Sequence, residues 1–204
     1  MQNPITLTVK SLNELWVEAQ QSSDESLLKR IVDGEKLAMQ ALFARHNARV
    51  FRFVIRLVGD ETVAEDLVSE VFIDVWRNAS RYAGHSQVST WIWAIARFKA
   101  ISVLRRHKDE MLDDAKAAAI PDTCDDPELS LQKKDRSAIL RMCLGQLSED
   151  HREVIDLVYY HEKSVEEVAE IVGVPKNTVK TRMYYARKRM SELLQQAGVD
   201  RTYQ

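Results

Sequence analysis

SVEEVAEIVGVPKNTVKTRMYYARKRM, residues 164–190, is the stretch that decides the fold of the C-terminal part of this chain. Ser164 and Glu167 have the spacing of a capping box, in which each side chain satisfies a backbone amide at the start of a helix. Gly173 ends that short helix, because glycine tolerates the positive φ of a tight turn. Pro175 fits the first turn of the next helix, where its missing amide needs no partner. The stretch therefore predicts two helices joined by a tight turn.

The second of these helices has one apolar side and one basic side. Lys and Arg can donate hydrogen bonds to guanine in the major groove, Thr and Tyr can make polar or methyl contacts, and flanking cations bind phosphates. We therefore expect a helix-turn-helix that binds duplex DNA; the alternative is a solvated helix surface. The apolar side holds Val179, Met183, Ala186, Met190 and Leu193, and the basic side holds Lys180, Thr181, Tyr184 and Lys188, with Arg182, Arg187 and Arg189 beside it.

Helical periodicity continues through most of the chain, and no alternation typical of strands persists anywhere. Ser22 and Glu25 fit a further capping box at the start of the first helix. A helix expected at about 62–78 carries one continuous apolar stripe. Its members are Val63, Ala64, Leu67, Val68, Val71, Phe72, Val75 and Trp76. The other helices are expected at about 35–58, 88–106, 134–144, 149–160, 165–172 and 175–196.

Two stretches lack this periodicity and divide the chain. Residues 1–22 contain only a short amphipathic piece and are expected to form a poorly ordered tail. Residues 108–133 contain two prolines, an alanine-rich patch and many acids, which is typical of a flexible connector. We predict an all-α protein with two small helical domains, 23–107 and 134–204, joined by this flexible acidic linker.

Charge is distributed in blocks along the chain, although the formal net charge is only -2. Residues 57–76 hold six acids and no Lys or Arg, whereas residues 77–106 hold six cations and no acid. Residues 176–190 again hold six cations and no acid. Because net charge averages over these segments, the blocks indicate several distinct partners.

The acidic block lies opposite the apolar stripe of the helix expected at about 62–78. Its acids form like-charge pairs four residues apart, each of which costs about 0.2–0.5 kcal/mol. A basic protein partner would explain the pattern, and a solvated face is the alternative. The pairs are Glu61 with Glu65, Asp66 with Glu70, and Glu70 with Asp74.

The first basic block mixes aromatic rings with cations in RYAGHSQVSTWIWAIARFK, residues 81–99. Rings stack on exposed bases and cations hold the backbone of a strand, so single-stranded DNA is a candidate ligand. Trp91 and Trp93 could equally belong to the hydrophobic core. The sequence leaves these two roles open.

No pattern in the sequence indicates an enzyme, a metal site or a membrane span. The five histidines lack metal-ligand spacing, and no phosphate-binding glycine loop is present. With no apolar run of about 18 residues and no secretory signal, we expect a cytoplasmic protein that is not inserted in a membrane and needs no cofactor. Cys124 and Cys143 are too few for a disulfide framework, and Cys143 has the setting of a buried small hydrophobe.

Three stretches carry a family pattern when taken together: AEDLVSEVF at 64–72, STWIWAIA at 89–96 and GVPKNTVKTR at 173–182. In this order and spacing they resemble the extracytoplasmic-function (ECF, group 4) sigma factors of bacterial RNA polymerase, in the sigma-70 family. They are similar to that family's polymerase-binding segment, promoter-melting segment and -35 reader, respectively. The resemblance implies two helical domains, called sigma2 and sigma4, joined by a linker that threads the polymerase.

The resemblance also implies a partner for each charge block. Core RNA polymerase would bind this protein through its β′ clamp helices and its β subunit. Promoter DNA would bind as a duplex at the -35 element and as a single strand at the -10 element. An anti-sigma factor would hold the protein inactive. The expected polymerase-binding residues are Glu65, Asp66, Glu70 and Asp74. Those expected at the -10 element are Arg81, Tyr82, His85, Ser86, Gln87, Trp91, Arg97 and Lys99. Those expected at the -35 element are Lys176, Thr178, Lys180, Thr181, Arg182, Tyr184, Tyr185, Arg187 and Lys188.

The sequence departs from the family pattern at three positions that bear on promoter choice. Tyr185 stands where many members carry Arg, and Phe98 and Ser102 stand where Asn and Asp are frequent. Two other functions fit part of the pattern. A helix-turn-helix regulator would bind operators as a dimer, but it would not need the acidic and the basic aromatic segments. A sigma mimic that sequesters an anti-sigma factor would not need a basic reading face.

Overall fold

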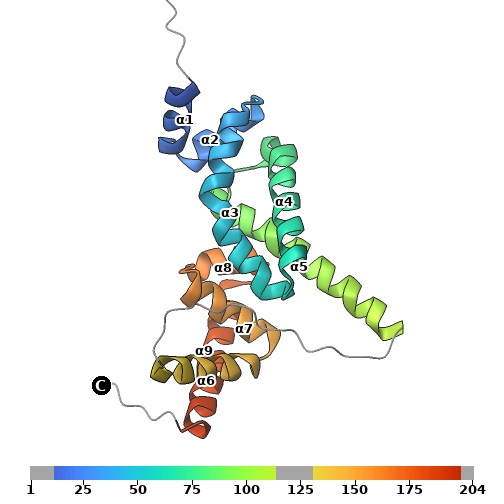
Figure 1. Ribbon diagram of the computed structural model, residues 1–204, viewed down its shortest axis with the longest axis vertical. Helices are drawn as coiled ribbons and strands as arrows, with labels where there is room; N and C mark the ends of the chain where they lie inside the picture. Colours follow the sequence, from blue (N-terminus) through green and yellow to red (C-terminus); the bar gives the residue numbers. More distant parts are fainter. Residues whose placement is uncertain (1–11, 114–130, 199–204) are drawn as a thin grey trace, which may run out of the picture. The chain divides into compact units, whose positions relative to one another are not determined.

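The computed structural model describes the backbone of residues 12–113 and 131–198 and the side chains of residues 16–107 and 138–198 (Figure 1). Every regular element in these ranges is a helix, which confirms the predicted all-α class. The chain divides into two compact units, Met1–Ala118 and Ala119–Gln204. No membrane-spanning helix is found among the described residues.

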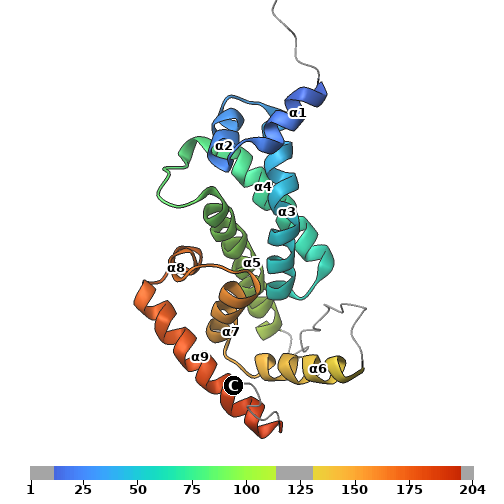
Figure 2. The ribbon, with the colours of Figure 1, turned by 90° about the vertical axis from the view of Figure 1, so that its left-hand side faces the viewer.

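The N-terminal unit is organised around one long helix, α3, which contacts α1, α2, α4 and α5. α4 and α5 also contact each other, so the three longest helices of this unit form a bundle (Figures 1 and 2). The elements are α1 (Leu12–Gln21), α2 (Asp24–Val32), α3 (Lys36–Val58), α4 (Glu61–Asn78), the 3-10 helix η1 (Ala79–Arg81) and α5 (Val88–Asp113).

The core of this unit lies where α3, α4 and α5 meet. Phe53 of α3 and Trp93 of α5 are buried and stack with ring centroids 4.8 Å apart. The apolar stripe predicted for α4 faces the same interior, except that Val63 is half-buried and Trp76 is 38% exposed at its margin. The buried members of the stripe are Ala64, Leu67, Val68, Val71, Phe72 and Val75.

The prediction of a poorly ordered tail over residues 1–22 is wrong for residues 12–21, and residues 1–11 lie outside the described residues. Residues Leu12–Gln21 form α1, which packs against α3 and buries Ala19 completely. Arg45 of α3 holds the end of this helix, because its Nη2 donates to the carbonyl oxygens of Gln20 and Ser22, each at 2.9 Å. The tail prediction failed because this contact joins residues more than 20 positions apart.

The predicted capping box of Ser22 and Glu25 is also wrong, by one residue. Ser23 is the N-cap of α2, and its Oγ accepts a hydrogen bond from the amide of Ser26 at 3.2 Å. Ser22 instead belongs to the end of α1, where its hydroxyl donates to the Glu18 carbonyl at 2.8 Å. The formation of α1 therefore moves the cap, since its last turn engages the serine that would otherwise start α2.

Asp24, in the first turn of α2, ties that helix to α3. Its carboxylate pairs with the Arg45 guanidinium, and its Oδ2 lies 2.7 Å from Nε2 of the buried His46. Partial burial alone would raise the pKa of Asp24, but the hydrogen bonds and charges of His46 and Arg45 hold that pKa below its usual value. One carboxylate thus joins the α1–α2 connection to the central helix.

α5 begins at the predicted residue but does not end at 106 as expected. It continues to Asp113, since the residues after Arg106 include Lys, Glu, Met and Leu, which favour helix. Residues 114–130 of the expected linker, Cys124 among them, lie outside the described residues.

The C-terminal unit is organised around α9, which contacts α6, α7 and α8 (Figure 2). The helix expected at 149–160 changes from α to π geometry at Asp156, and Cys143 is buried as predicted. The elements are α6 (Leu131–Gly145), α7 (Glu149–Ile155), the π-helical turn η2 (Asp156–Tyr160), α8 (Val165–Val172) and α9 (Lys176–Gln196).

Arg152 of α7 closes the C-terminal end of α6. Its Nε donates to the Leu144 carbonyl at 3.2 Å, and its Nη2 donates to the carbonyls of Gly145 at 2.9 Å and Leu147 at 3.2 Å. The last carbonyls of a helix have no partner within the helix. One guanidinium therefore binds the carbonyls of Leu144 and Gly145 at the end of α6 and that of Leu147 in the connection to α7.

We predict that Arg152→Ala lowers the free energy of unfolding of the C-terminal unit by about 2 kcal/mol, since the lost hydrogen bonds involve a charged donor. Urea unfolding followed by far-UV circular dichroism measures both units, whereas tryptophan fluorescence reports only the N-terminal unit. That unit contains all four tryptophans, Trp16, Trp76, Trp91 and Trp93.

The control is Lys188→Ala, which removes an exposed cation from the same unit. The role assigned to Arg152 is contradicted if both variants shift the dichroism transition equally. It is also contradicted if Arg152→Ala shifts the fluorescence transition as much as the dichroism transition.

Candidate nucleic-acid interface

The turn between α8 and α9 has the local structure predicted from residues 164–190. Ser164 Oγ accepts from the Glu167 amide at 3.1 Å, and Glu167 Oε2 accepts from the Ser164 amide at 2.9 Å, which confirms the capping box. Gly173 ends α8 in the left-handed region, with φ of 73°. Pro175 serves as the N-cap of α9, one position earlier than expected.

An ion pair crosses this turn on its solvent side. Lys176 Nζ lies 3.3 Å from Glu166 Oε1, and both side chains are more than half exposed. The backbone amide of Glu166 itself and the neighbouring Lys176 lower the pKa of the Glu166 carboxyl. Because exposed pairs of this kind contribute little to stability, Lys176 can exchange this partner for a phosphate at small cost.

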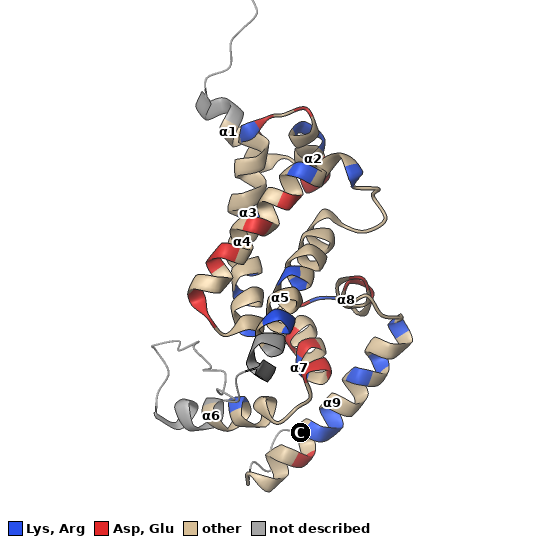
Figure 3. Ribbon diagram, turned by 90° about the vertical axis from the view of Figure 1, so that its right-hand side faces the viewer, with Lys and Arg blue, Asp and Glu red and all other residues tan. Residues whose placement is uncertain are grey.

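α9 buries a narrow apolar stripe and exposes a broad basic face. Val179, Ala186 and Leu193 are buried, so the expected apolar side is confirmed at these positions. On the exposed face, Tyr184 and Tyr185 are 59% and 53% exposed, and their rings meet edge to face at 5.4 Å. Figure 3 shows the cations spaced along this helix. The other exposed residues from the expected -35 set are Lys176, Lys180, Thr181, Arg187 and Lys188, and Thr178 is half-buried.

Arg182 is the member of that set that the structure turns away from the exposed face. Its Nη2 lies 2.7 Å from Asp150 Oδ2 of α7, and its side chain is only 21% exposed. The helical period places it next to the buried stripe rather than beside Tyr184. Arg182 therefore joins α9 to α7 in this structure.

In the N-terminal unit, the segment 81–88 folds back on the start of α5; it runs from the last residue of η1 through the loop 82–87 to the first residue of α5. The Tyr82 hydroxyl donates to the Ser86 carbonyl, and the Tyr82 ring lies 5.4 Å from the ring of Trp91. Gly84 takes a positive φ of 71°, which lets the loop reverse. Of the residues expected at the -10 element, Arg81, His85 and Gln87 are exposed, whereas Tyr82, Ser86, Trp91, Arg97 and Lys99 are half-buried.

The two tryptophans, whose roles the sequence left open, take different positions. Trp93 is 2% exposed and stacks on Phe53, so it is a core residue. Trp91 is half-buried beside Tyr82, where one side of its ring faces the loop. Phe98, which departs from the family pattern, is 73% exposed on α5.

Lys99 lies against the acidic helix. Its Nζ is 3.0 Å from Glu70 Oε2 and 2.8 Å from Asp74 Oδ2 of α4. Burial would lower the pKa of Lys99, but the two carboxylates raise it. The sequence analysis missed this cluster because Lys99 and Glu70 are 29 positions apart. Lys99 relieves the like-charge pair of Glu70 and Asp74. Glu65 and Asp66 are also exposed on this helix, whose acids are red in Figure 3.

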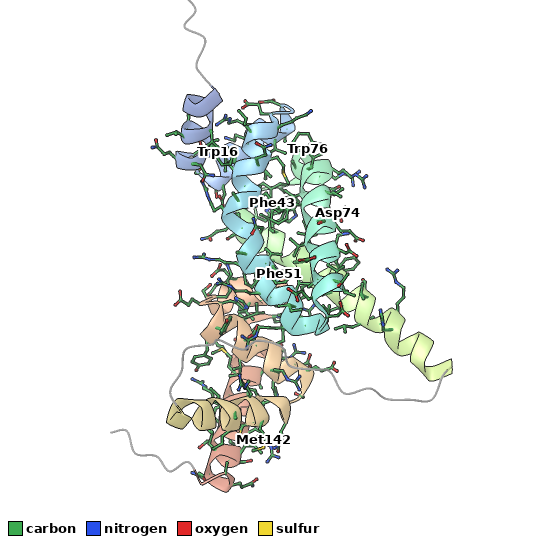
Figure 4. All side chains as sticks on the ribbon, in the orientation of Figure 1. Trp16, Phe43, Phe51, Asp74, Trp76 and Met142 are labelled. Carbon is green, nitrogen blue, oxygen red and sulfur yellow. The ribbon has the colours of Figure 1, made fainter. Side chains whose placement is uncertain are left out.

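Apolar side chains are exposed next to these acids, which sequence reasoning also missed. Ile73 and Trp76 of α4 are 47% and 38% exposed. Phe43 of α3 is 41% exposed and meets Phe72 edge to face at 4.8 Å. Figure 4 labels Phe43, Trp76 and Asp74 on these two helices. Exposed apolar groups rimmed by charge are typical of protein-binding surfaces.

No group of three or more His, Cys, Asp or Glu side chains that could hold a metal ion occurs in the described ranges. The described residues form three charged surfaces. The two basic ones are the exposed face of α9 and the loop before α5 with the start of that helix, and the acidic one is the exposed face of α4.

Comparison with known proteins assigns this chain to a family. The family described as Sigma-70 region 2 matches residues 42–110, and Sigma-70, region 4 matches residues 137–190. The chain is 30% identical over 172 residues to the ECF RNA polymerase sigma factor SigL of Mycobacterium tuberculosis, covering 82% of this chain and 94% of SigL. It is 32% identical over 172 residues to the RNA polymerase sigma factor CarQ of Myxococcus xanthus, covering 82% and 95%.

A solved structure agrees with these matches. The sigma factor RpoE of Bartonella quintana, determined in complex with the anti-sigma factor NepR, superposes with a TM-score of 0.63. The two sequences are 27% identical, and the match covers 75% of this chain and 94% of the RpoE chain.

Two sigma-70 regions in this order define a transcription initiation factor rather than a catalytic enzyme. The chain belongs to the sigma-70 family of RNA polymerase sigma factors, in its ECF group. An operator-binding regulator would not account for both matched regions.

The positions of the tryptophans lead to a prediction about stability. Trp93→Ala should lower the free energy of unfolding of the N-terminal unit by about 3–5 kcal/mol, because it leaves a cavity against Phe53. Trp91→Ala should cost less than about 1.5 kcal/mol, since that ring is only half-buried. Urea unfolding followed by circular dichroism and by the remaining tryptophans measures both values. Equal losses for the two variants would contradict the assignment of Trp93 to the core.

Proposed function

We propose that this sigma factor binds core RNA polymerase through α4 and directs initiation at promoters that it contacts in two places. α9 reads the -35 element as duplex DNA, and the segment 81–88 with the start of α5 binds the -10 element as single strand. The factor acts in the cytoplasm with polymerase. The observation that carries this proposal is the exposed basic face of α9, which holds no acid over residues 176–190, on a capped helix-turn-helix in one chain with the acidic face of α4.

At the -35 element, Lys180, Tyr184 and Lys188 form the centre of the reading face. They recur at helical spacing, and each is exposed. Lys180 and Lys188 suit guanine acceptors or phosphates, and Tyr184 and Thr181 suit polar or methyl contacts. Arg182 has a different role in this proposal, because its pair with Asp150 holds α9 at a set angle to α7.

At the -10 element, the loop and α5 offer two aromatic rings and several cationic groups. Tyr82 and Trp91 form a small aromatic wall, and Arg81 and His85 are exposed at the loop. Bases removed from a duplex gain about 1–3 kcal/mol each by stacking on such rings. Trp93 takes no part, since it is buried.

The polymerase-binding surface combines the acids of α4 with apolar neighbours. Glu65 and Asp66 supply exposed negative charge, and Ile73 and Trp76 supply apolar area. Charge complementarity speeds and orients association, while the apolar groups contribute affinity. A basic surface on polymerase would meet both.

An anti-sigma factor is the proposed regulator. Support comes from RpoE, which was determined in complex with NepR and resembles this chain in sequence and fold. Such a partner would compete with polymerase for the N-terminal unit, and co-purification of this chain with an inhibitory protein that releases it on induction would test the idea.

The function is tested by run-off transcription. Purified chain plus core polymerase is expected to start RNA at discrete sites on genomic fragments, whereas core alone does not and the chain alone binds duplex weakly. Tight operator binding without polymerase, and no initiation with it, would favour a regulator instead.

For the reading face, we predict that Lys180→Ala and Tyr184→Ala lower initiation by roughly 5- to 100-fold at some promoters and little at others, since one good base contact is worth about 1–3 kcal/mol. Arg189→Ala is the matched control, because Arg189 is an exposed cation of α9 that pairs with Glu192. If all three variants reduce initiation uniformly across promoters, Lys180 and Tyr184 contribute no base readout, and unchanged initiation would remove them from the DNA contact altogether.

For the polymerase surface, we predict that Asp66→Lys weakens binding to core by about tenfold or more, because a cation would then face a basic partner. Asp33→Lys reverses the same charge at the end of α2 and serves as the control. Affinity is measured by competition with a labelled sigma factor. An unchanged affinity for Asp66→Lys would restore the view of α4 as a solvated face.

A further inference from the structure

Lys99 is a cation of the basic block that does not face the loop proposed to hold DNA. It belongs to residues 77–106, which contain six cations and no acid. In the structure its ammonium group instead meets two carboxylates of α4, Glu70 and Asp74, at 3.0 and 2.8 Å. One side chain therefore connects the helix proposed to bind DNA with the helix proposed to bind polymerase.

The geometry of the cluster allows its partners to be exchanged. The carboxylates reach solvent, with side-chain exposures of 58% for Glu70 and 34% for Asp74, while the Lys99 stem is covered and its own exposure is 17%. Because both carboxylates are open to solvent, a competing cation can approach them and take the place of Lys99. Lysine has a flexible four-carbon stem and can redirect its ammonium without movement of the backbone.

The position of Lys99 along α5 places it within reach of a strand on that helix. It lies eight residues after Trp91, which corresponds to about 12 Å along a helix axis. Its neighbours Arg97 and Phe98 are half-buried and exposed, respectively. An ammonium released here would meet the phosphates that follow a base stacked near Trp91.

We propose that Glu70 and Asp74 hold Lys99 away from DNA in the free protein, and that polymerase, by pairing with these two acids, releases Lys99 to bind a phosphate of the -10 strand. The inference rests on the proposed function, since it assigns α4 to polymerase and α5 to DNA. Binding of each partner then favours binding of the other, as reciprocal coupling requires. The cluster gives a physical reason for weak DNA binding by the free chain.

The test measures DNA binding by the full-length chain without polymerase. The probe is a labelled oligo(dT) of about 20 nucleotides, because stacking on aromatic rings tolerates any sequence. The double variant Glu70→Gln, Asp74→Asn keeps the size of both side chains and removes their charge. We expect it to bind the probe roughly fivefold more tightly than the wild type, at the lower end of typical coupling. The salt dependence should steepen by about 0.7, the value for one additional phosphate contact.

Two controls separate release of Lys99 from a general change in charge. Glu61→Gln with Glu65→Gln removes two acids from the first half of α4, away from Lys99, and should leave affinity for the probe within twofold of the wild type. Adding Lys99→Met to the double variant should abolish its gain. Asp74→Asn alone, which keeps Glu70, gives an intermediate gain and replaces the double variant if that does not fold.

The proposal is overturned if the double variant gains no affinity, if the control pair gains as much, or if the gain survives Lys99→Met. Run-off transcription by the wild-type chain with core polymerase is measured separately. If the wild type initiates transcription but the variants behave in any of these three ways, the coupling fails and the proposed function stands. If the wild type does not initiate at all, the proposed function itself fails.

Discussion

The stacking of Trp93 on Phe53 sets the rotation of α5 about its own axis, and the surfaces of the N-terminal unit depend on that rotation. Successive residues of a helix are turned by about 100°. With Trp93 directed inward, Phe98 is turned about 140° away and points outward, while Lys99 is turned to the side where α4 lies. The same rotation per residue turns Trp91 outward at the loop. A single buried contact thus decides which groups of α5 point outward at the loop and which meet the neighbouring helix.

In the C-terminal unit the corresponding constraint is the narrow apolar stripe of α9. Val179, Ala186 and Leu193 can cover only one side of a helix of this length, so the opposite side stays in solvent with its cations and tyrosines. Arg182 lies at the border between the two sides and pairs with Asp150, and Arg152 closes the end of α6. Both arginines stabilise the scaffold, whereas Lys180 and Lys188 remain available to a ligand.

Opposite charges that look like independent blocks in the sequence are connected in space. The acidic face of α4 is divided into Glu65 and Asp66 in its first half and Glu70 and Asp74 in its second half, where the two carboxylates hold Lys99. A sigma factor must bind polymerase and DNA with one small domain. Sharing a lysine between the two surfaces is an economical way to make one event depend on the other.

The sequence by itself determined the all-α class, the helix-turn-helix with its capping box at Ser164, and the family. All three depend on hydrogen bonds and apolar contacts between residues three or four positions apart. Because this spacing matches the helical period, it can be recognised in the sequence. Only the tertiary structure decided that residues 12–21 form a helix, that Trp93 is core while Trp91 is not, and that Lys99 and Arg182 face acids rather than DNA. Each of these outcomes depends on how two helices cross, which is set by the packing of residues about 20 or more positions apart and leaves no local trace in the chain.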